Sequence, residues 1–218
     1  MGIGRDKKIA YISDLEQATD FEFLYSQQKK LDPKICEKII LYMAKPHSLA
    51  IPKETNFENL KMRELNHAYI LDLAIKSGER PIDLDLITDG LAKTVDFLMN
   101  DQELKTAAEQ LGKLYFESTR TLIHGDYYPM SWIETYKGLF VIDPEFGFLG
   151  LPEIDVGIFL AQMLLSDNFE MAYDLVGKKY GLYNDELVAK FCVVEVIRRI
   201  SHVAQLPIEN SLFFKQSC

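Results

Sequence analysis

Apolar residues recur at helical spacing at both ends of the chain and at strand spacing only near its middle. In the first half, apolar side chains return about every 3.6 residues, the period of a helix with one buried face. Helices are predicted over about 14–30, 34–43, 63–77, 81–100 and 102–118. The second of these is expected to end before Pro46, and Asp101 is the expected cap of the last. A surface loop is predicted over about 45–61.

Three short runs of β-branched and aromatic residues interrupt this helical pattern. They span Thr121–His124, Ser131–Tyr136 and Leu139–Asp143, and Lys137–Gly138 is a predicted turn between the last two. Helical periodicity returns after Pro152 and predicts helices over about 154–163, 169–179 and 184–203. The pattern therefore predicts an α+β protein that is mainly helical, with a small β element in its middle.

Length and composition allow a sizeable core, in one large domain or two small ones. At 218 residues and 48% hydrophobic content the chain can bury such a core, and no internal repeat or linker divides it. The net charge of −9 argues against a nucleic-acid partner, because phosphate contacts need a basic surface. No apolar run approaches the roughly 18 residues of a membrane span, and the N-terminus lacks an apolar signal region. We therefore expect a cytoplasmic protein without a membrane partner.

Carboxylates follow two of the apolar runs in an arrangement that suits phosphoryl transfer. His124-Gly125-Asp126 comes after the first run, and Asp143-Pro144-Glu145 comes after the third. Phosphoryl transfer needs one carboxylate near the attacking hydroxyl and separate oxygen ligands that hold Mg²⁺ against the nucleotide phosphates. Either segment alone is also an ordinary turn, in which the carboxylate bonds its own backbone or is solvated. Their joint occurrence is rarer than either part and indicates half of a kinase active site.

Around these motifs the chain resembles the catalytic lobe of methylthioribose kinases. The resemblance lies in Leu122–Asp126, in Ser131 five residues later, and in Val141–Gly150 and Ile154–Leu160. Those kinases belong to the superfamily of aminoglycoside and choline phosphotransferases, which share the protein-kinase fold. Where the wider superfamily usually has asparagine, methylthioribose kinases carry the serine found at Ser131. Weaker similarity extends the resemblance to roughly residues 30–206.

The resemblance implies roles for four residues of the β element. Asp126 corresponds to the catalytic base, Asp143 and Glu145 to Mg²⁺ ligands, and Ser131 to an auxiliary residue near the metal. It also implies ATP as the co-substrate and a hydroxyl group of a small sugar-like metabolite as the acceptor. The expected activity is therefore that of a small-molecule kinase that depends on ATP and Mg²⁺.

Four further residues receive roles from the same resemblance. Arg198 and Arg199 match an arginine pair near the acceptor sugar and the transferred phosphoryl group, whose charge a guanidinium fork stabilises. The alternative, that both lie on the polar edge of an amphipathic helix, stays open. His124 is expected to pack behind the catalytic loop, and Asp155 to anchor that loop through backbone hydrogen bonds. Tyr127–Met130 departs from the family's small polar loop, which predicts a narrower or reshaped acceptor pocket.

Kinases of this superfamily also carry an N-terminal β-rich lobe, whose Gly-rich loop and strand lysine hold the nucleotide phosphates. Gly2–Gly4 with Lys7–Lys8 is a faint counterpart that we interpret as a terminal tail, because no strand precedes it and no helix follows it. The residues before His124 are predicted to be helical. We therefore expect residues 1–218 to form a single kinase-like C-terminal lobe without a Gly-rich-loop lobe.

Several interpretations of such a lone lobe stay open. It is a fragment of a kinase, one part of a split enzyme that binds a separate nucleotide-binding lobe, or a catalytically inactive lobe that serves as a binding or interaction module. An exposed apolar patch would favour a lobe partner or a homodimer, because removal of a lobe uncovers surface. A metal-dependent phosphoesterase is a weaker alternative, because the chain lacks the His and Asp clusters of a two-metal site.

Overall fold

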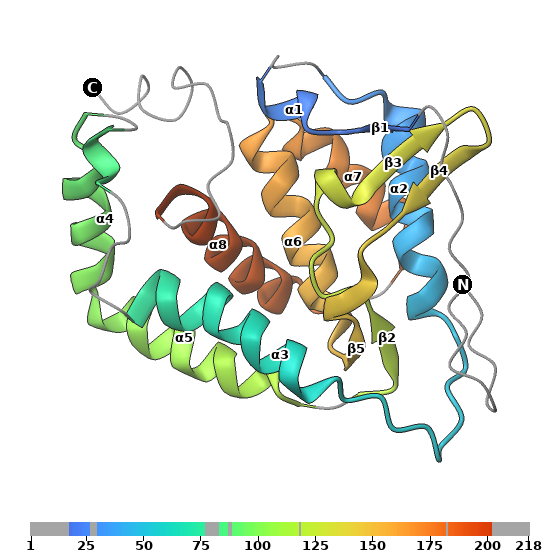
Figure 1. The fold of residues 1–218 in the computed structure, drawn as a ribbon, viewed down its shortest axis with the longest axis horizontal. Coiled ribbons are helices and arrows are strands. Elements are labelled where there is room, and N and C mark those ends of the chain that lie inside the picture. Colours follow the sequence, from blue (N-terminus) through green and yellow to red (C-terminus); the bar gives the residue numbers. More distant parts are fainter. Residues whose placement is uncertain are drawn as a thin grey trace.

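The computed structural model describes residues 18–26, 30–76, 83–86, 89–117, 119–181 and 183–201, and it is mainly helical (Figure 1). The helices are α1 (Phe23–Ser26), α2 (Pro33–His47), α3 (Leu60–His67), the π-helix η1 (Ala68–Lys76), α4 (Leu91–Asn100), α5 (Gln102–Tyr115), α6 (Pro152–Leu165), α7 (Phe169–Lys179) and α8 (Asp185–Ser201). Single 3₁₀ turns are η2 (Leu84–Leu86), η3 (Pro129–Ser131) and η4 (Pro144–Phe146). The strands are β1 (Thr19–Asp20), β2 (Thr121–Ile123), β3 (Trp132–Thr135), β4 (Gly138–Val141) and β5 (Phe148–Gly150). The predicted class, mainly helical with a small β element, is confirmed.

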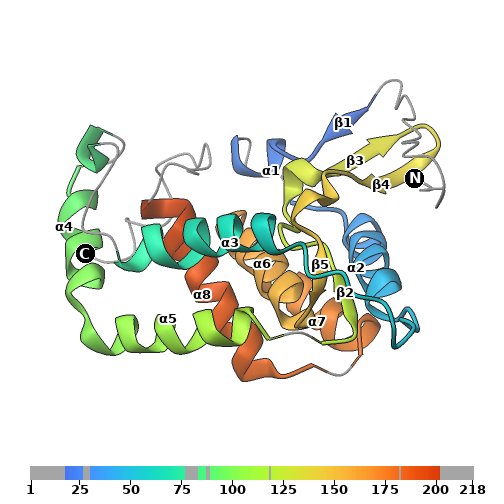
Figure 2. The same ribbon diagram turned by 60° about the horizontal axis from the view of Figure 1, so that its bottom comes forward.

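Helix α6 forms the centre of the molecule. Figures 1 and 2 show it between α8 on one side and the strands with α2 on the other. Its residues are buried almost all round, because one apolar cluster packs Val156 and Phe159 with α2, and a second packs Ile154 and Ile158 with α5 and α8. Since α6 and α8 are also packed against each other, the side chains of α8 near its C-terminal end reach the β element.

The strand pairing brings the two carboxylate segments together. β2 and β5 are antiparallel, with Ile123 opposite Phe148, so the residues that follow β2 meet the residues that precede β5. β3 and β4 are antiparallel as well, with Trp132 opposite Val141. The three predicted strands are confirmed as β2, β3 and β4, whereas β5 was not predicted. A three-residue strand that ends in Gly150 carries too short a pattern to be recognised.

The predicted helix over about 14–30 is wrong in its described part. Thr19–Asp20 instead forms β1, which pairs antiparallel with β3 in the sheet order β1-β3-β4. The backbone pairing with a distant segment overrides the helical spacing of the apolar residues, and only the short helix α1 follows. Residues 14–17 and 27–29 lie outside the described residues.

Several helix boundaries also differ from the predictions, most clearly at the end of α2 and before α4. α2 continues through Pro46, because a proline in the last turn forgoes one hydrogen bond while the Ser48 N–H still closes the helix on the Ala44 carbonyl. The described part of the segment 81–100 holds the turn η2 and then α4, since Gly90 has a left-handed backbone (φ 78°) directly before α4. The Asp101 cap of α5 is confirmed by its hydrogen bonds.

None of the helices in the described ranges has the length and apolar character that a bilayer crossing requires.

Candidate active site

The loop after β2 carries Asp126 and is held in a tight turn. Gly125 has φ 84°, a left-handed conformation that favours glycine. A Cβ atom at this position would lie 2.4 Å from the Phe146 carbonyl oxygen, so the turn packs directly on η4. Asn66 donates from Nδ2 to the Gly125 carbonyl at 2.8 Å. The residue before Asp126 therefore has to be glycine for both steric and conformational reasons.

Asp155 of α6 anchors this loop through the loop's backbone N–H groups. Its Oδ1 accepts the Gly125 N–H at 2.8 Å, and its Oδ2 accepts the His124 N–H at 2.7 Å and lies 3.0 Å from His47 Nε2. Burial raises the pKa of Asp155, but the hydrogen bond and charge of His47, together with His124, hold it below its ordinary value. The carboxylate therefore stays ionised and fixes two successive backbone amides of the loop. This is the arrangement expected for Asp155 from the resemblance.

His124 and Ser131 connect the loop to β4. His124 Nε2 lies 2.8 Å from the Ile142 carbonyl oxygen, which can only accept, so Nε2 carries the proton. Its Nδ1 accepts the Asp126 N–H at 3.4 Å. The Ser131 carbonyl accepts the Ile142 N–H at 2.9 Å, and its hydroxyl donates to the Asp126 carbonyl at 3.4 Å. Both side chains thus hold the backbone around Asp126 rather than its carboxylate.

Two arginines of α8 contact the Asp126 carboxylate. Arg198 Nη2 lies 3.1 Å and Arg199 Nη2 3.4 Å from Asp126 Oδ1. The Asp126 side chain is 18% exposed, while both arginine side chains are 6% exposed. Since both arginines are buried, they do not lie on a solvated helix edge, which was the alternative left open by the sequence. The structure therefore brings three of the predicted site residues together.

Glu195 belongs to the same cluster, although the sequence analysis did not select it. It is buried and accepts hydrogen bonds from Arg198 and Arg199. Burial raises the pKa of Glu195, but the charges of the two arginines outweigh this effect and lower it. The spacing Glu-x-x-Arg-Arg contained the signal, because residues three and four positions apart on a helix are neighbours.

Asp143 and Glu145 lie at the other side of the loop, and both are exposed. Asp143 has a left-handed backbone (φ 58°) at the start of η4. Within the described ranges, neither carboxylate makes a hydrogen bond or ion pair. Asn59 Nδ2 donates to the carbonyls of Glu145 and Gly147, at 2.7 Å and 2.9 Å, and so holds the segment by its backbone. Both carboxylates remain available to a ligand.

This pair of oxygen donors fits the chemistry of Mg²⁺. Mg²⁺ usually takes one or two carboxylates from the protein and its other ligands from water and substrate phosphates. Asp143 and Glu145 offer two such carboxylates without a competing protein cation in the described part of the chain. No group of three or more His, Cys, Asp or Glu residues in that part could hold a metal ion by itself. Asp143 and Glu145 can therefore supply two protein ligands to a Mg²⁺ ion.

The two tyrosines after Asp126 have different environments. Tyr127 is a core residue whose hydroxyl donates to the Ile39 carbonyl at 2.7 Å. Tyr128 is half-buried, and the Arg199 guanidinium carbon lies 4.6 Å from the centre of its ring. Burial and the negative charges of Asp126 and Asp143 raise the pKa of Tyr128, against the opposing charge of the arginines. Tyr128 therefore lies within electrostatic reach of both candidate carboxylate groups.

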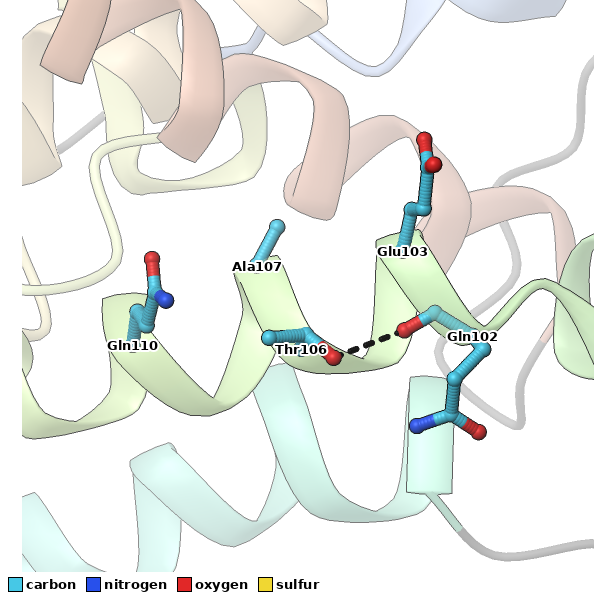
Figure 3. Close-up of a pocket in the computed structure, with 5 residues that line it drawn as sticks. All are labelled: Gln102, Glu103, Thr106, Ala107 and Gln110. Atoms are coloured by element: carbon cyan, nitrogen blue, oxygen red, sulfur yellow. Dashed lines mark hydrogen bonds between the residues drawn. The ribbon is translucent and has the colours of Figure 1, made fainter.

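Two surface cavities share no residue with this site. One, of about 310 Å³, lies on α5 and is lined by Gln102, Glu103, Thr106, Ala107 and Gln110, whose side chains Figure 3 shows. A groove of about 270 Å³ between α5 and α8 is mostly apolar and includes Leu104, Leu111 and Val193. Neither is lined by Asp126, Asp143 or the arginine pair, so the loop around Asp126 remains the candidate active site.

Comparisons with known proteins give partial matches, and no family model matches the chain. It is 39% identical over 67 residues to methylthioribose kinase of Bacillus velezensis, a match that takes in 31% of this chain and 17% of the relative. It is 36% identical over 84 residues to methylthioribose kinase of Exiguobacterium sibiricum, a match that takes in 38% of this chain and 22% of the relative. It is 38% identical over 66 residues to methylthioribose kinase 1 of Oryza sativa, a match that takes in 30% of this chain and 15% of the relative. The chain thus spans about a fifth of the length of the curated relatives it matches.

Among solved structures, choline kinase LicA from Streptococcus pneumoniae superposes with a TM-score of 0.48 at 15% identity, over 86% of this chain and 58% of that chain. The resemblance to methylthioribose kinases is confirmed by the sequence matches for about a third of the chain.

Proposed function

We propose that this chain is the catalytic lobe of a small-molecule kinase, which transfers a phosphoryl group from ATP, with Mg²⁺, to a hydroxyl group of a small sugar-like metabolite. The observation that carries the proposal is the setting of Asp126. Its loop is fixed by Asp155, one carboxylate oxygen contacts two arginines, and the other has no hydrogen-bond partner among the described residues. The partial similarity to methylthioribose kinases supports the same class of reaction.

In this proposal Asp126 accepts the proton of the acceptor hydroxyl. Oδ1 is engaged by Arg198 and Arg199, which leaves Oδ2 to bind the hydroxyl and take its proton as the oxygen attacks. The loop positions the carboxylate before the substrate arrives, which matters because positioning and electrostatics supply most of the catalysis of phosphoryl transfer. The buried arginines stabilise negative charge on the transferred group.

Asp143 and Glu145 are the proposed ligands of Mg²⁺. When bound, the ion would neutralise negative charge on the phosphates. Ser131 and His124 keep the backbone between the two carboxylate groups in place. The residues that the sequence selected therefore divide into a proton-accepting side and a metal side. The nucleotide is proposed to approach from the metal side and the acceptor from the side of Asp126.

Tyr128 is the proposed reason for an acceptor that differs in shape from methylthioribose. Where the family has a small polar loop after the aspartate, this chain has Tyr127–Met130, and the ring of Tyr128 lies against Arg199 two residues after Asp126. A ring in this position narrows the space beside the proton-accepting oxygen. The acceptor is therefore proposed to be a compact sugar or polyol.

The part of the chain that the structure describes contains no Gly-rich nucleotide loop, so we propose that residues 1–218 form a C-terminal lobe. A nucleotide-binding lobe then comes from another segment of the protein, a separate chain or a second copy. The isolated chain is expected to bind ATP weakly, because in this proposal the nucleotide contacts of the other lobe are supplied from outside it. A dissociation constant below the micromolar range would contradict this expectation.

The first experiment is a phosphoryl-transfer assay on the purified chain. ATP, Mg²⁺ and a panel of acceptors, including methylthioribose, ribose, erythritol and choline, are incubated with the chain, and phosphorylated products are detected by mass spectrometry. Slow transfer that stops when EDTA removes Mg²⁺ supports the proposal. Transfer that continues after EDTA removes Mg²⁺, or that Asp126→Asn leaves unchanged, overturns it.

A catalytically inactive interaction module is the second candidate function. The apolar groove between α5 and α8 favours it, because Val193 is 50% exposed at a site lined mainly by apolar atoms. Sedimentation of the chain over a range of concentrations would reveal self-association. A folded monomer that transfers phosphate would leave this candidate without support.

A further inference from the structure

The adjacent arginines of α8 share one buried carboxylate. Successive residues of an α-helix point about 100° apart, so Arg198 and Arg199 leave α8 in different directions, although both contact Asp126 Oδ1. A residue three positions before one and four before the other is a neighbour of both on the helix. Glu195 is this residue, since it precedes Arg198 by three positions and Arg199 by four.

The contacts of Glu195 fix both guanidinium groups. Its Oε2 accepts from Arg198 Nε at 2.7 Å, and its Oε1 accepts from Arg198 Nη2 at 2.8 Å and from Arg199 Nε at 2.7 Å. The Glu195 side chain is 1% exposed. The two-bond contact of Arg198 with Glu195 is directional as well as strong, and Arg199 is held to the same carboxylate by one charge-assisted hydrogen bond.

A second set of contacts fixes Glu195 itself. Gln162 of α6 donates from Nε2 to Glu195 Oε1 at 2.6 Å, and its own Oε1 accepts the Tyr25 hydroxyl at 2.6 Å. All three side chains are buried. The chain of contacts therefore runs from α1 through α6 to α8, and it ends at the arginines that contact Asp126.

The charges of the cluster balance only if Glu195 is included. Two guanidinium groups that lie close together repel each other, and Asp126 supplies only one negative charge. With Glu195 ionised, two positive and two negative groups cancel. Without that charge both guanidinium groups would be drawn more strongly to Asp126, and its second oxygen would then compete for them.

We propose that Glu195 is a positioning residue for the reaction: it holds Arg198 and Arg199 so that both engage Oδ1 of Asp126 and leave Oδ2 to accept the proton. Gln162 and Tyr25 support it. The catalytic part of this inference rests on the proposed function. The contacts by which Glu195 fixes the two arginines can be tested separately, without an activity assay.

The structural test uses Glu195→Gln, with Glu186→Gln as the matched control. Glu186 lies on the same helix, is exposed and pairs with Lys190, so the control makes the same chemical change outside the cluster. Nitrogen-15 NMR follows the arginine Nε–H signals, assigned with Arg198→Lys and Arg199→Lys. We expect slow hydrogen exchange at both signals in the wild type and at least about tenfold faster exchange in Glu195→Gln. Unchanged exchange in a folded Glu195→Gln variant would overturn the inference.

The catalytic test separates kcat from KM. Glu195→Gln is expected to lower kcat about 10²-fold, because misplacement of a catalytic group by about 1 Å has that effect, with the KM for ATP nearly unchanged. A purely structural role would lower stability without lowering the kcat of the folded variant. Unchanged kcat in a folded Glu195→Gln variant would contradict the inference.

Milder variants cover the case in which Glu195→Gln does not fold. Tyr25→Phe removes only the hydroxyl that orients Gln162, and it should shift the exchange rates and kcat in the same direction by about two- to fivefold. Glu195→Asp keeps the charge and should recover part of the lost kcat. If Asp126→Asn retains full turnover, the proposed function fails, while the exchange measurement still decides whether Glu195 holds the arginines.

Discussion

Asp126 and Asp143 are both candidate site carboxylates in loops beside short strands, yet the protein surrounds them differently. Asp126 lies in a network of buried charges, in which Arg198, Arg199 and Glu195 fix one another. Asp143 is exposed and makes no ion pair or hydrogen bond with the residues that the structure describes. The first environment is complete within the chain, whereas the second lacks partners that would offset its charge.

This difference separates preorganised groups from groups that await a ligand. Substitutions in the arginine cluster should affect both folding and catalysis, because each member is a partner of a buried neighbour. Substitutions at Asp143 or Glu145 should affect ligand binding while leaving stability almost unchanged, because no protein partner is lost. Measurements of both stability and ligand binding, for variants of the arginine cluster and for variants of Asp143 or Glu145, would test this contrast.

The largest effect is expected from Asp126→Asn. The amide cannot accept the proton of the acceptor hydroxyl, so kcat should fall about 10³-fold, which corresponds to about 4 kcal/mol of lost transition-state stabilisation. The assay is phosphoryl transfer at saturating ATP and Mg²⁺, with the acceptor found in the panel. Transfer within threefold of the wild-type rate would remove Asp126 from the mechanism.

Asp155→Asn should give the largest loss of stability, about 3 kcal/mol, because two loop amides and His47 lose a buried carboxylate partner. Since the pKa of Asp155 is lowered in the folded state, its contribution is present above the unfolded pKa of about 4 and is lost as the pH falls through the folded pKa. Urea unfolding at several pH values measures this.

In the same series, the difference between the wild type and Asp155→Asn should shrink below about pH 4. Asp174→Asn, which removes one partner of an exposed pair with Lys178, serves as the matched control. A difference that is as large at pH 3 as at pH 7 would show that the Asp155 carboxylate charge does not support the loop.

Asp143→Asn should weaken Mg²⁺-dependent ATP binding at least about tenfold, or about 1.4 kcal/mol, and leave the melting temperature unchanged. Asparagine also tolerates the left-handed backbone at this position, so the substitution tests the charge alone. Asp143→Ala is the contrasting variant, because alanine adds backbone strain. Calorimetry with and without Mg²⁺ gives the affinity, and a fall in melting temperature for Asp143→Asn would show that Asp143 has a structural partner.

The sequence predicted the mainly helical class and pointed to candidate site residues, but not how distant segments pair. Motif spacing selected Asp126 and Asp143, because loop chemistry depends on local residues that a single chain displays, and the family resemblance added the arginine pair. The antiparallel pairing of β2 with β5 and of β1 with β3 could not be predicted, since it joins segments far apart in sequence. Glu195 was missed for a different reason: a charged residue inside a helical pattern resembles a solvent-facing one until burial is known.

The smallest effect is expected at Tyr128, and it tests whether the metal side and the arginine side share one pocket. Because the raised pKa keeps the hydroxyl protonated, it can donate to an acceptor, and Tyr128→Phe should raise the acceptor KM about threefold, or about 0.6 kcal/mol. Tyr128→Ala removes the ring from Arg199 and should favour bulkier acceptors over compact ones. Tyr136→Phe, at an exposed position, is the control. If neither variant at Tyr128 changes the order of acceptor preference, the ring does not border the acceptor, and the pocket must open on the other side of Asp126.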